Sequence, residues 1–344
     1  MELNKIYTCP TSASFAIANP HWLRFIRKRV KAKSEDIKGP ITLIVVPKDV
    51  GKTTLCRFLL NYAVRSVRCP LFIDLDVGQN LISVPGTIGI ANIQKPGNIY
   101  DNFEEETSKV FHFGYTSPGN NIPLFGLLFK KVRSNSSIRG LRGANPKTRY
   151  SGVIINTCGC SGYDIITFAA IAFKIDVLCV LQEERLYQQL LKDMSLSVKV
   201  VFTPKMNGAV ERIQTVRSES RDAHLKKFFY GPSNELQPFT FGVKYSEFKV
   251  LKILSRVGVK VVTNVTLNVI LLPIHLDHRL IDQVLTLSSA EVYENDLILA
   301  HAFGFICITG INVDENIITV LSPQPGPLPK KVLLVGVTEL IQRQ

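Results

Sequence analysis

The chain has 344 residues, and its 41 Lys and Arg outnumber its 28 Asp and Glu, which gives a formal charge of +13. Because 46% of the residues are hydrophobic and 20% are charged, the composition excludes a disordered chain and predicts about two globular domains. No apolar run approaches the ~18 residues of a membrane-spanning helix, so no membrane span is expected. The N-terminus lacks the pattern of a secretory signal, which predicts an intracellular protein. Seven Cys without zinc-ligand spacing predict reduced thiols and no zinc site.

Short apolar segments alternate with segments of helical spacing over the first two thirds of the chain. Residues 41–46 read as a buried strand, and a loop and then a helix over 53–64 follow. Further strands are predicted over 71–75, 153–155, 177–181 and 198–202, and further helices over 163–173 and 184–191. This alternation predicts an α/β fold in which a parallel sheet carries helices on both faces.

The pattern changes at about residue 239 to β-branched, alternating segments broken by turn residues. Strands are predicted over 249–253, 257–262, 265–272, 304–311 and 317–321. They predict a second, smaller and mostly β domain over 236–344, with a hinge at Gly231-Pro232-Ser233-Asn234.

The segment after the first strand meets the phosphate-binding pattern G-x-x-x-x-G-K-[ST] at every fixed position except the first glycine, which is Val46. In such a loop, backbone N–H groups and the following helix N-terminus cradle phosphates. Lys52 would reach the β- and γ-phosphates, and the Thr53 hydroxyl would hold Mg²⁺. The predicted nucleotide-binding residues are Asp49, Val50, Gly51, Lys52, Thr53 and Thr54.

Two aspartates, Asp74 and Asp76, end the next predicted strand, and alternation places both on one face. A carboxylate there can bind Mg²⁺ through water or take the proton of an attacking hydroxyl. The alternative for a single Asp is a turn cap. Two aspartates followed by Gly78 and Gln79 indicate more than a structural role.

Positive charge is concentrated between Thr107 and Tyr163, where no Asp or Glu occurs. Such a segment is typical of a polyanion-binding surface, and the alternative is a solvated loop over 129–150. A second basic run, from Arg24 to Lys33, fits an exposed helix face or a nuclear-import signal. The basic residues of the acid-free segment are Lys109, Lys130, Lys131, Arg133, Arg139, Arg142, Lys147 and Arg149.

Three arginines, Arg212, Arg217 and Arg221, lie in a polar segment near the predicted hinge. On a helix Arg217 and Arg221 share a face, whereas Arg212 lies well round the axis unless the helix begins late. Arginines can stabilise the charge that develops on a transferring phosphoryl group. The alternative is a solvated helix with the acidic neighbours as partners.

A set of short motifs occurs in the order and near the spacing of one known family. They are Val50-Gly51-Lys52-Thr53-Thr54, Asp74-Leu75-Asp76-Val77-Gly78-Gln79, Pro85-Gly86-Thr87, His112-Phe113-Gly114, Thr116-Ser117-Pro118-Gly119, Asn156-Thr157-Cys158-Gly159 and Leu321-Ser322-Pro323. From about residue 12 to its end, the chain resembles the Clp family of polyribonucleotide 5′-hydroxyl kinases, which are subunits of the pre-mRNA 3′-end cleavage complex. The resemblance implies a P-loop NTPase domain over 41–235, with a family C-terminal β domain after it.

The resemblance also implies transfer of the γ-phosphate of ATP to the 5′-hydroxyl of RNA, with Mg²⁺ as cofactor. It maps Lys52, Asp76 and the three arginines to catalysis, the arginines forming a lid, and Thr53, Asp74 and Asp76 to the metal. It maps Gln79 and Thr116, Ser117, Pro118 and Gly119 to a clasp for the RNA 5′ end. The implied partners are subunits of the cleavage complex and the tRNA-splicing endonuclease, and the implied location is the nucleus.

The sequence departs from the family at three places. The family glycine is Val46, and Cys160-Ser161-Gly162-Tyr163 follows Gly159 where the family has a tryptophan-containing turn that stacks on RNA. Residues 1–40 resemble only the end of the family's N-terminal domain and its connecting helix. The first two departures favour an alternative function, an ATP-binding scaffold of the cleavage machinery that does not turn over.

Overall fold

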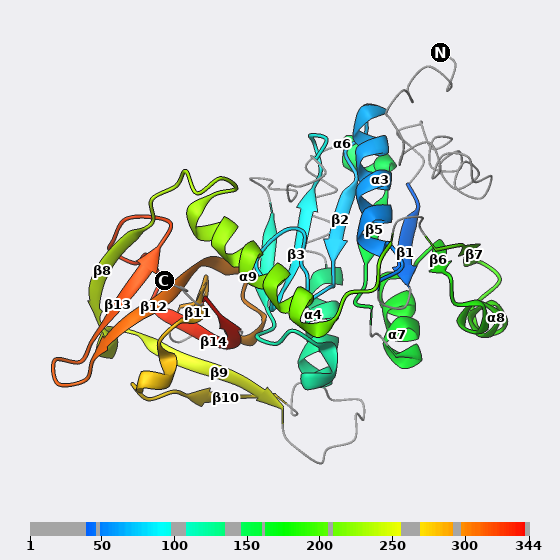
Figure 1. The fold of residues 1–344 in the computed structure, drawn as a ribbon. Coiled ribbons are helices and arrows are strands. Elements are labelled where there is room, and N and C mark those ends of the chain that lie inside the picture. The colour runs from blue at the N-terminus through cyan, green and yellow to red at the C-terminus, as the bar shows by residue number, and fades with distance from the viewer. Residues whose placement is uncertain are drawn as a thin grey trace. The chain divides into compact units, whose positions relative to one another are not determined.

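The computed structural model describes residues 39–45, 49–97, 108–134, 146–159, 162–205, 209–255, 269–291 and 297–340. Figure 1 shows two β-sheets, and helices lie beside the strands of the first sheet. The chain divides into two units. The first contains Met1–Ile73, Ala91–Glu105 and Arg133–Arg212, and the second contains Asp74–Ile90, Glu106–Val132 and Ile213–Gln344.

The first sheet has seven strands. In order of hydrogen-bonded neighbours they are β4 (Lys109–His112), β3 (Thr87–Asn92), β2 (Leu71–Asp74), β5 (Val153–Asn156), β1 (Ile41–Val45), β6 (Val177–Leu181) and β7 (Lys199–Thr203). β1 pairs in parallel with β5 and β6, and β6 with β7. Every residue of β1, β2, β5 and β6 is buried, as expected for apolar strands covered on both faces. The predicted α/β fold with a largely parallel sheet is confirmed.

The pairing of β3 with β4 is antiparallel and was not predicted. β3 contains Gly89 between its two isoleucines, and β4 is only four residues long, so neither strand gives a strong pattern in the sequence. The segments before β3 and after β4 belong to the second unit of the chain, whereas most of the connection between the two strands belongs to the first.

Three helices pack on the parallel strands. α3 (Lys52–Arg65) contacts β1 and β5, α7 (Tyr163–Phe173) contacts β1, and α8 (Glu184–Asp193) contacts β6 and β7. The buried stripe of α3 contains Leu55, Leu59, Leu60 and Ala63, the residues whose spacing predicted the helix. A short helix, α6 (Pro146–Ser151), precedes β5. Within the described ranges, no helix combines the length and apolarity needed to cross a membrane.

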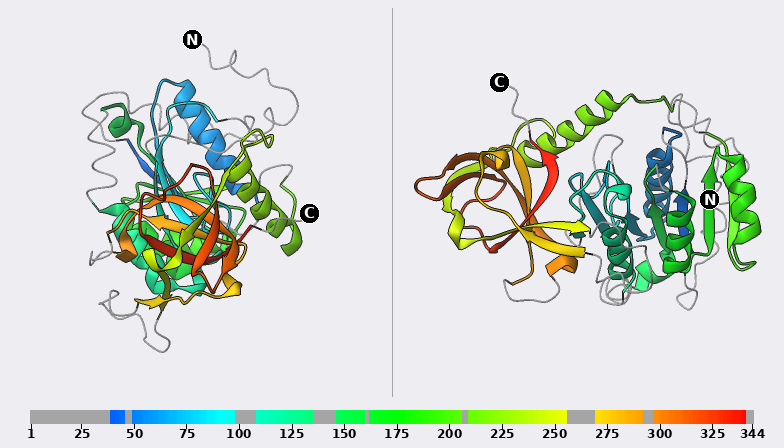
Figure 2. Two further views of the ribbon diagram at one scale, coloured as in Figure 1. Left: turned by 90° about the vertical axis from the view of Figure 1, so that its left-hand side faces the viewer. Right: turned by 90° about the horizontal axis from the view of Figure 1, so that it is seen from below.

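The second unit contains the other seven-stranded sheet, which is twisted and curved in the views of Figure 2. Its strands, in spatial order, are β10 (Val269–Pro273), β9 (Lys249–Ser255), β14 (Val332–Glu339), β11 (Gln283–Ser288), β12 (Ala302–Asn312), β13 (Ile317–Ser322) and β8 (Phe239–Lys244). All neighbours are antiparallel except β14 and β9, which are parallel. Two helices, α4 (Ile122–Arg133) and α9 (Gln214–Tyr230), occur before this sheet in the chain.

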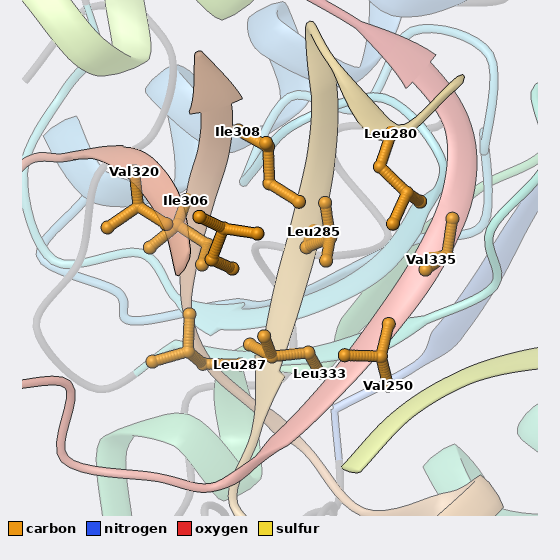
Figure 3. Close-up of a cluster of buried hydrophobic side chains, with 10 residues drawn as sticks. Val250, Leu280, Leu285, Leu287, Ile306, Ile308, Val320, Leu333 and Val335 are labelled. Carbon is orange, nitrogen blue, oxygen red and sulfur yellow. The ribbon is translucent and has the colours of Figure 1, made fainter. Parts of the chain in front are cut away.

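A cluster of buried aliphatic side chains forms the core of the second sheet (Figure 3). Leu285, Ile308 and Leu333 are fully buried, and each buried side chain of this size contributes roughly 1.5–3 kcal/mol of transfer free energy. The predicted mostly β domain and its strands near 249–253, 304–311 and 317–321 are confirmed. The strand predicted over 257–262 lies outside the described residues.

Candidate active site

The described part of the loop between β1 and α3 begins at Asp49 and leads directly into the helix. Asp49 and Gly51 both have positive φ angles, 60° and 91°, and Gly51 is the residue before the first turn of α3. Glycine adopts this region without the steric cost of a Cβ atom. The first turn of α3 contains no acidic residue and has no side-chain cap. Its N–H groups and the helix dipole therefore suit an anion.

Lys52 begins α3 and is almost completely buried. Its side chain is held at the carboxyl end of β5, where the ammonium group donates a hydrogen bond to the carbonyl of Thr157. The Thr157 hydroxyl donates in turn to the carbonyl of Ile44 in β1 at 2.8 Å. Next to it, the Cys56 thiol donates to Oδ1 of Asn156 at 3.6 Å. Thr157 thus holds the lysine, and Asn156 contacts the same helix through Cys56; sequence reasoning did not assign these roles.

Arg212 is joined to the phosphate loop. Its main-chain N–H and its Nε group donate to the Asp49 carboxylate at 3.1 and 3.2 Å. α9 begins late, at Gln214, so Arg212 precedes the helix and Arg217 and Arg221 lie on it four residues apart. Both helical arginines are half-buried and belong to the second unit.

Asp74 and Asp76 occupy different environments at the end of β2. Asp74 is fully buried, and its two carboxylate oxygens accept hydrogen bonds from the N–H groups of Asp76 and Leu81 at 2.9 and 2.7 Å. Asp76 is half-buried and accepts from the N–H groups of Gly78 and Gln79. Asp74 therefore shapes the turn, whereas Asp76 has the exposure that a group acting on substrate or metal requires.

The turn at Asp76 lies against the loop after β4. A Cβ atom placed on Gly78 would lie 3.0 Å from the carbonyl oxygen of Thr116 and 3.4 Å from Oδ1 of Asp76. The loop that begins at Thr116 therefore lies next to the turn that contains Gln79. These are the two segments predicted to bind the RNA 5′ end. We call them the RNA clasp, which consists of Gln79 and Thr116–Gly119. Ser117 precedes a short 3₁₀ turn, Pro118–Asn120, whose Gly119 is exposed.

Other predicted residues lie outside the described residues. These are Val46 at the start of the phosphate loop, Cys160 and Ser161 after Gly159, Arg139 and Arg142 of the acid-free segment, and the basic run Arg24–Lys33.

The described loop fits a nucleotide phosphate, because it offers backbone N–H groups, a buried ammonium group and no acidic residue in the first turn of α3. Across the described ranges, no three His, Cys, Asp or Glu side chains gather as metal ligands. Thr53 offers a hydroxyl and Asp76 a half-buried carboxylate, and Mg²⁺ commonly uses one or two such protein ligands together with waters and substrate phosphates.

Two sequence families match the chain. "mRNA cleavage and polyadenylation factor CLP1 P-loop" matches residues 47–231, and "Pre-mRNA cleavage complex II protein Clp1" matches residues 236–340. The protein CLP1 homolog of Culex quinquefasciatus is 42% identical over 319 residues, which cover 90% of this chain and 74% of the relative. The homolog of Brugia malayi is 41% identical over 326 residues, with 91% and 74% covered.

Two solved structures share the fold. One is a wild-type Clp1p–Pcf11p complex, with a TM-score of 0.78 at 22% identity over 98% of this chain and 82% of that chain. The other is a Pcf11p–Clp1p structure that concerns their extended interface and ATP loss in a point mutant. It has a TM-score of 0.79 at 21% identity and covers 98% of this chain and 83% of that chain. From the two matching sequence families and from relatives that are more than 40% identical, the chain belongs to the Clp1 family of pre-mRNA cleavage complex proteins.

Proposed function

We propose that the protein is an ATP-dependent RNA 5′-hydroxyl kinase of the pre-mRNA 3′-end cleavage machinery and that it acts in the nucleus. The observation that carries this proposal is the loop Asp49–Thr54, in which a left-handed Gly51 leads into a helix that starts with the buried Lys52. Membership of the Clp1 family supports nucleotide binding and a role in the cleavage machinery. The kinase activity rests on the residues described below.

Each residue has a defined task in phosphoryl transfer. The N–H groups of the loop and the Lys52 ammonium bind the β- and γ-phosphates of ATP. The 5′-hydroxyl oxygen attacks the γ-phosphorus, its proton passes to the Asp76 carboxylate, and the bond to the β–γ bridging oxygen breaks to release ADP. Arg212, Arg217 and Arg221 offset charge on the transferring group. Mg²⁺, held by Thr53 and Asp76 with Asp74 behind them, would neutralise phosphate charge when bound.

The RNA clasp binds the 5′ end, and the acid-free segment binds the following phosphates. Support comes from the close packing of the Asp76 turn on Thr116, since it puts the proposed base and the proposed RNA contacts on neighbouring loops. Proposed partners are other subunits of the cleavage complex, among them a Pcf11-type protein, since the solved relatives are complexes with Pcf11p. The tRNA-splicing endonuclease is a further proposed partner.

A kinase assay with labelled ATP and a 5′-hydroxyl RNA tests the proposal. We expect the wild type to transfer label, and we expect Lys52→Ala and Asp76→Asn to lose nearly all transfer. Lys192→Ala, which removes an exposed lysine of α8, is the matched control and should keep it. ATP binding without transfer by the wild type would contradict the kinase function.

That result would favour the second candidate, an ATP-binding scaffold without turnover. The sequence feature behind it is Val46, whose isopropyl group stands where the family has glycine. If this side chain limits the enzyme by its bulk, Val46→Gly should raise turnover or ATP affinity. No change in either quantity would show that the bulk of Val46 does not matter.

A further inference from the structure

The loop that follows β4 is attached to the second sheet at two successive residues. The carbonyl of Gly114 accepts a hydrogen bond from the N–H of Val337 in β14 at 2.9 Å. The hydroxyl of Tyr115 donates to the carbonyl of Ile253 in β9 at 3.0 Å. Thr116, where the second segment of the RNA clasp begins, comes directly after these contacts. The second sheet therefore fixes the backbone at the entry to the clasp.

A buried histidine at the end of β4 makes a third contact with this sheet. Nδ1 of His112 lies 2.8 Å from the Thr286 hydroxyl of β11. Burial lowers the pKa of His112 to about 4, although a hydrogen bond with the backbone of Val335 opposes this shift. The imidazole is therefore neutral near pH 7, and the contact holds the two elements together without a buried charge.

Two glycines let the backbones of the loop and of β14 touch. A Cβ atom on Gly336 would lie 3.1 Å from the carbonyl oxygen of Gly114, and one on Gly114 would lie 2.7 Å from Nε2 of His112. Gly114 also has a φ of 82°, which other residues rarely adopt. Because side chains would separate these segments, direct backbone contact leaves little freedom for the loop to shift.

The turn that carries Asp76 is tied to the same loop. The N–H of Gly86 donates to the carbonyl of Val77 at 2.8 Å. The carbonyl of Gly86 accepts from the N–H groups of Phe113 and Gly114, both at 2.9 Å. A continuous set of hydrogen bonds thus runs from β9 and β14, through the loop after β4, to the turn at Asp76.

We propose that the second sheet positions the RNA clasp and that Tyr115 is the positioning residue through which β9 sets the place of Thr116. This inference rests on the proposed function, because it assigns the clasp to the 5′ end of RNA. Tyr115 itself does not touch the substrate. The hydrogen bond from its hydroxyl to the Ile253 carbonyl fixes Tyr115, and this in turn fixes the backbone of the neighbouring Thr116.

The chain offers a matched control for a test of Tyr115. The half-buried Tyr245 also donates from its hydroxyl to a main-chain carbonyl, that of Ile274, at 2.7 Å, but it lies in a 3₁₀ turn between β8 and β9 and packs on the core of the second sheet. Tyr115→Phe and Tyr245→Phe each delete one such hydrogen bond, so similar losses of stability are expected. Only Tyr115→Phe should lower the affinity for a 5′-hydroxyl RNA oligonucleotide, by about fivefold. ATP affinity should stay within about twofold in both variants.

Amide hydrogen exchange gives a readout that does not depend on RNA. Exchange at Thr116–Asn121 should become faster in Tyr115→Phe and stay unchanged in Tyr245→Phe. Thr286→Val should act like Tyr115→Phe, because it removes the partner of His112, and Thr286→Ser should restore the wild-type behaviour. Equal RNA affinity and equal exchange in the two tyrosine variants would overturn the inference. If the wild type itself bound no RNA, the proposed function would fail, whereas faster exchange in Tyr115→Phe alone would still show that the sheet positions the loop.

Discussion

The carboxylate of Asp49 and the guanidinium of Arg212 form an ion pair at 3.2 Å, although 163 residues separate them in the chain. The pair links the phosphate loop to the segment that leads into α9. The Asp49 side chain is 5% exposed and that of Arg212 is 40% exposed, so water screens the arginine more than the aspartate. This contact ties the first arginine of the proposed lid to the loop that would bind the phosphates.

A double-mutant cycle of Asp49→Asn and Arg212→Ala should reveal coupling between the two residues. Asn tolerates the positive φ of Asp49, so the substitution removes charge with little backbone strain. We expect a coupling free energy of unfolding of about 0.5–1 kcal/mol, because one partner is partly exposed. It should decrease in ~1 M salt. Strictly additive effects in urea unfolding would show that the pair contributes no coupling.

The parallel strands of the first sheet were predictable because each is a short, continuous apolar run next to a segment of helical spacing. β1 and β6 have this pattern, and every residue in them is buried. β14 was not predicted, although it is also apolar, because a run such as Val332–Val335 fits a buried helix as well as a strand. Its place between β9 and β11 depends on residues far away in the chain.

The candidate site was predictable where its residues are local in sequence. The loop Asp49–Thr54 follows a strand and begins a helix, so its pattern and context occur together. The contact between Lys52 and the Thr157 carbonyl was not predictable, because it joins residues 105 apart through the backbone of another strand. The turn-shaping role of Asp74 likewise depends on the N–H of Leu81, seven residues away.

His112 should make the stability of the protein depend on pH. Its pKa is lowered from 6.5 to about 4 by burial, so the unfolded chain takes up a proton at a higher pH than the folded protein. The contribution of neutral His112 to the free energy of unfolding is fully present above pH ~6.5 and is lost as the pH falls toward ~4. Between pH ~7.5 and ~5 we expect a loss of about 2 kcal/mol in the free energy of unfolding.

Urea unfolding of the wild type and of His112→Asn at these two pH values measures this contribution. The variant lacks the imidazole, so its pH dependence should be smaller than that of the wild type by about 2 kcal/mol. His278→Asn, which removes an exposed imidazole, serves as the control. Parallel pH profiles for the wild type and His112→Asn would mean that the buried imidazole does not resist protonation.

Two lysines near His301, Lys109 and Lys131, should contribute to RNA binding. Burial and then the charges of Lys109, Lys131 and Lys330 lower the pKa of His301, which places these ammonium groups in one electrostatic neighbourhood. Lys109 and Lys131 belong to the acid-free segment, and Lys330 also pairs with Glu291 at 2.7 Å. The double variant Lys109→Glu and Lys131→Glu should bind RNA more weakly. Its plot of log binding constant against log salt concentration should also be shallower, by roughly 0.7 in slope for each RNA phosphate that is no longer neutralised.

Titration of a labelled RNA at several salt concentrations checks this prediction. Lys192→Glu on the exposed surface of α8 adds a matched charge change away from the acid-free segment. It should leave the salt slope at the wild-type value. An unchanged slope in the double variant would show that these two lysines do not contact the RNA backbone.

Gly78 should be intolerant of a side chain because it packs between Asp76 and Thr116 of the RNA clasp. A Cβ atom at this position would lie 3.0 Å from the carbonyl oxygen of Thr116, closer than carbon and oxygen atoms normally pack. Gly78→Ala should therefore move Thr116 or Asp76 by a few tenths of an ångström. That displacement should lower kinase turnover by about tenfold, since small errors in the position of a reacting group are costly. Gly304→Ala in β12 is the matched control, because a Cβ atom there meets no heavy atom within 4 Å. Turnover and RNA affinity equal to those of Gly304→Ala would show that the close approach of Gly78 and Thr116 does not set the geometry of the site.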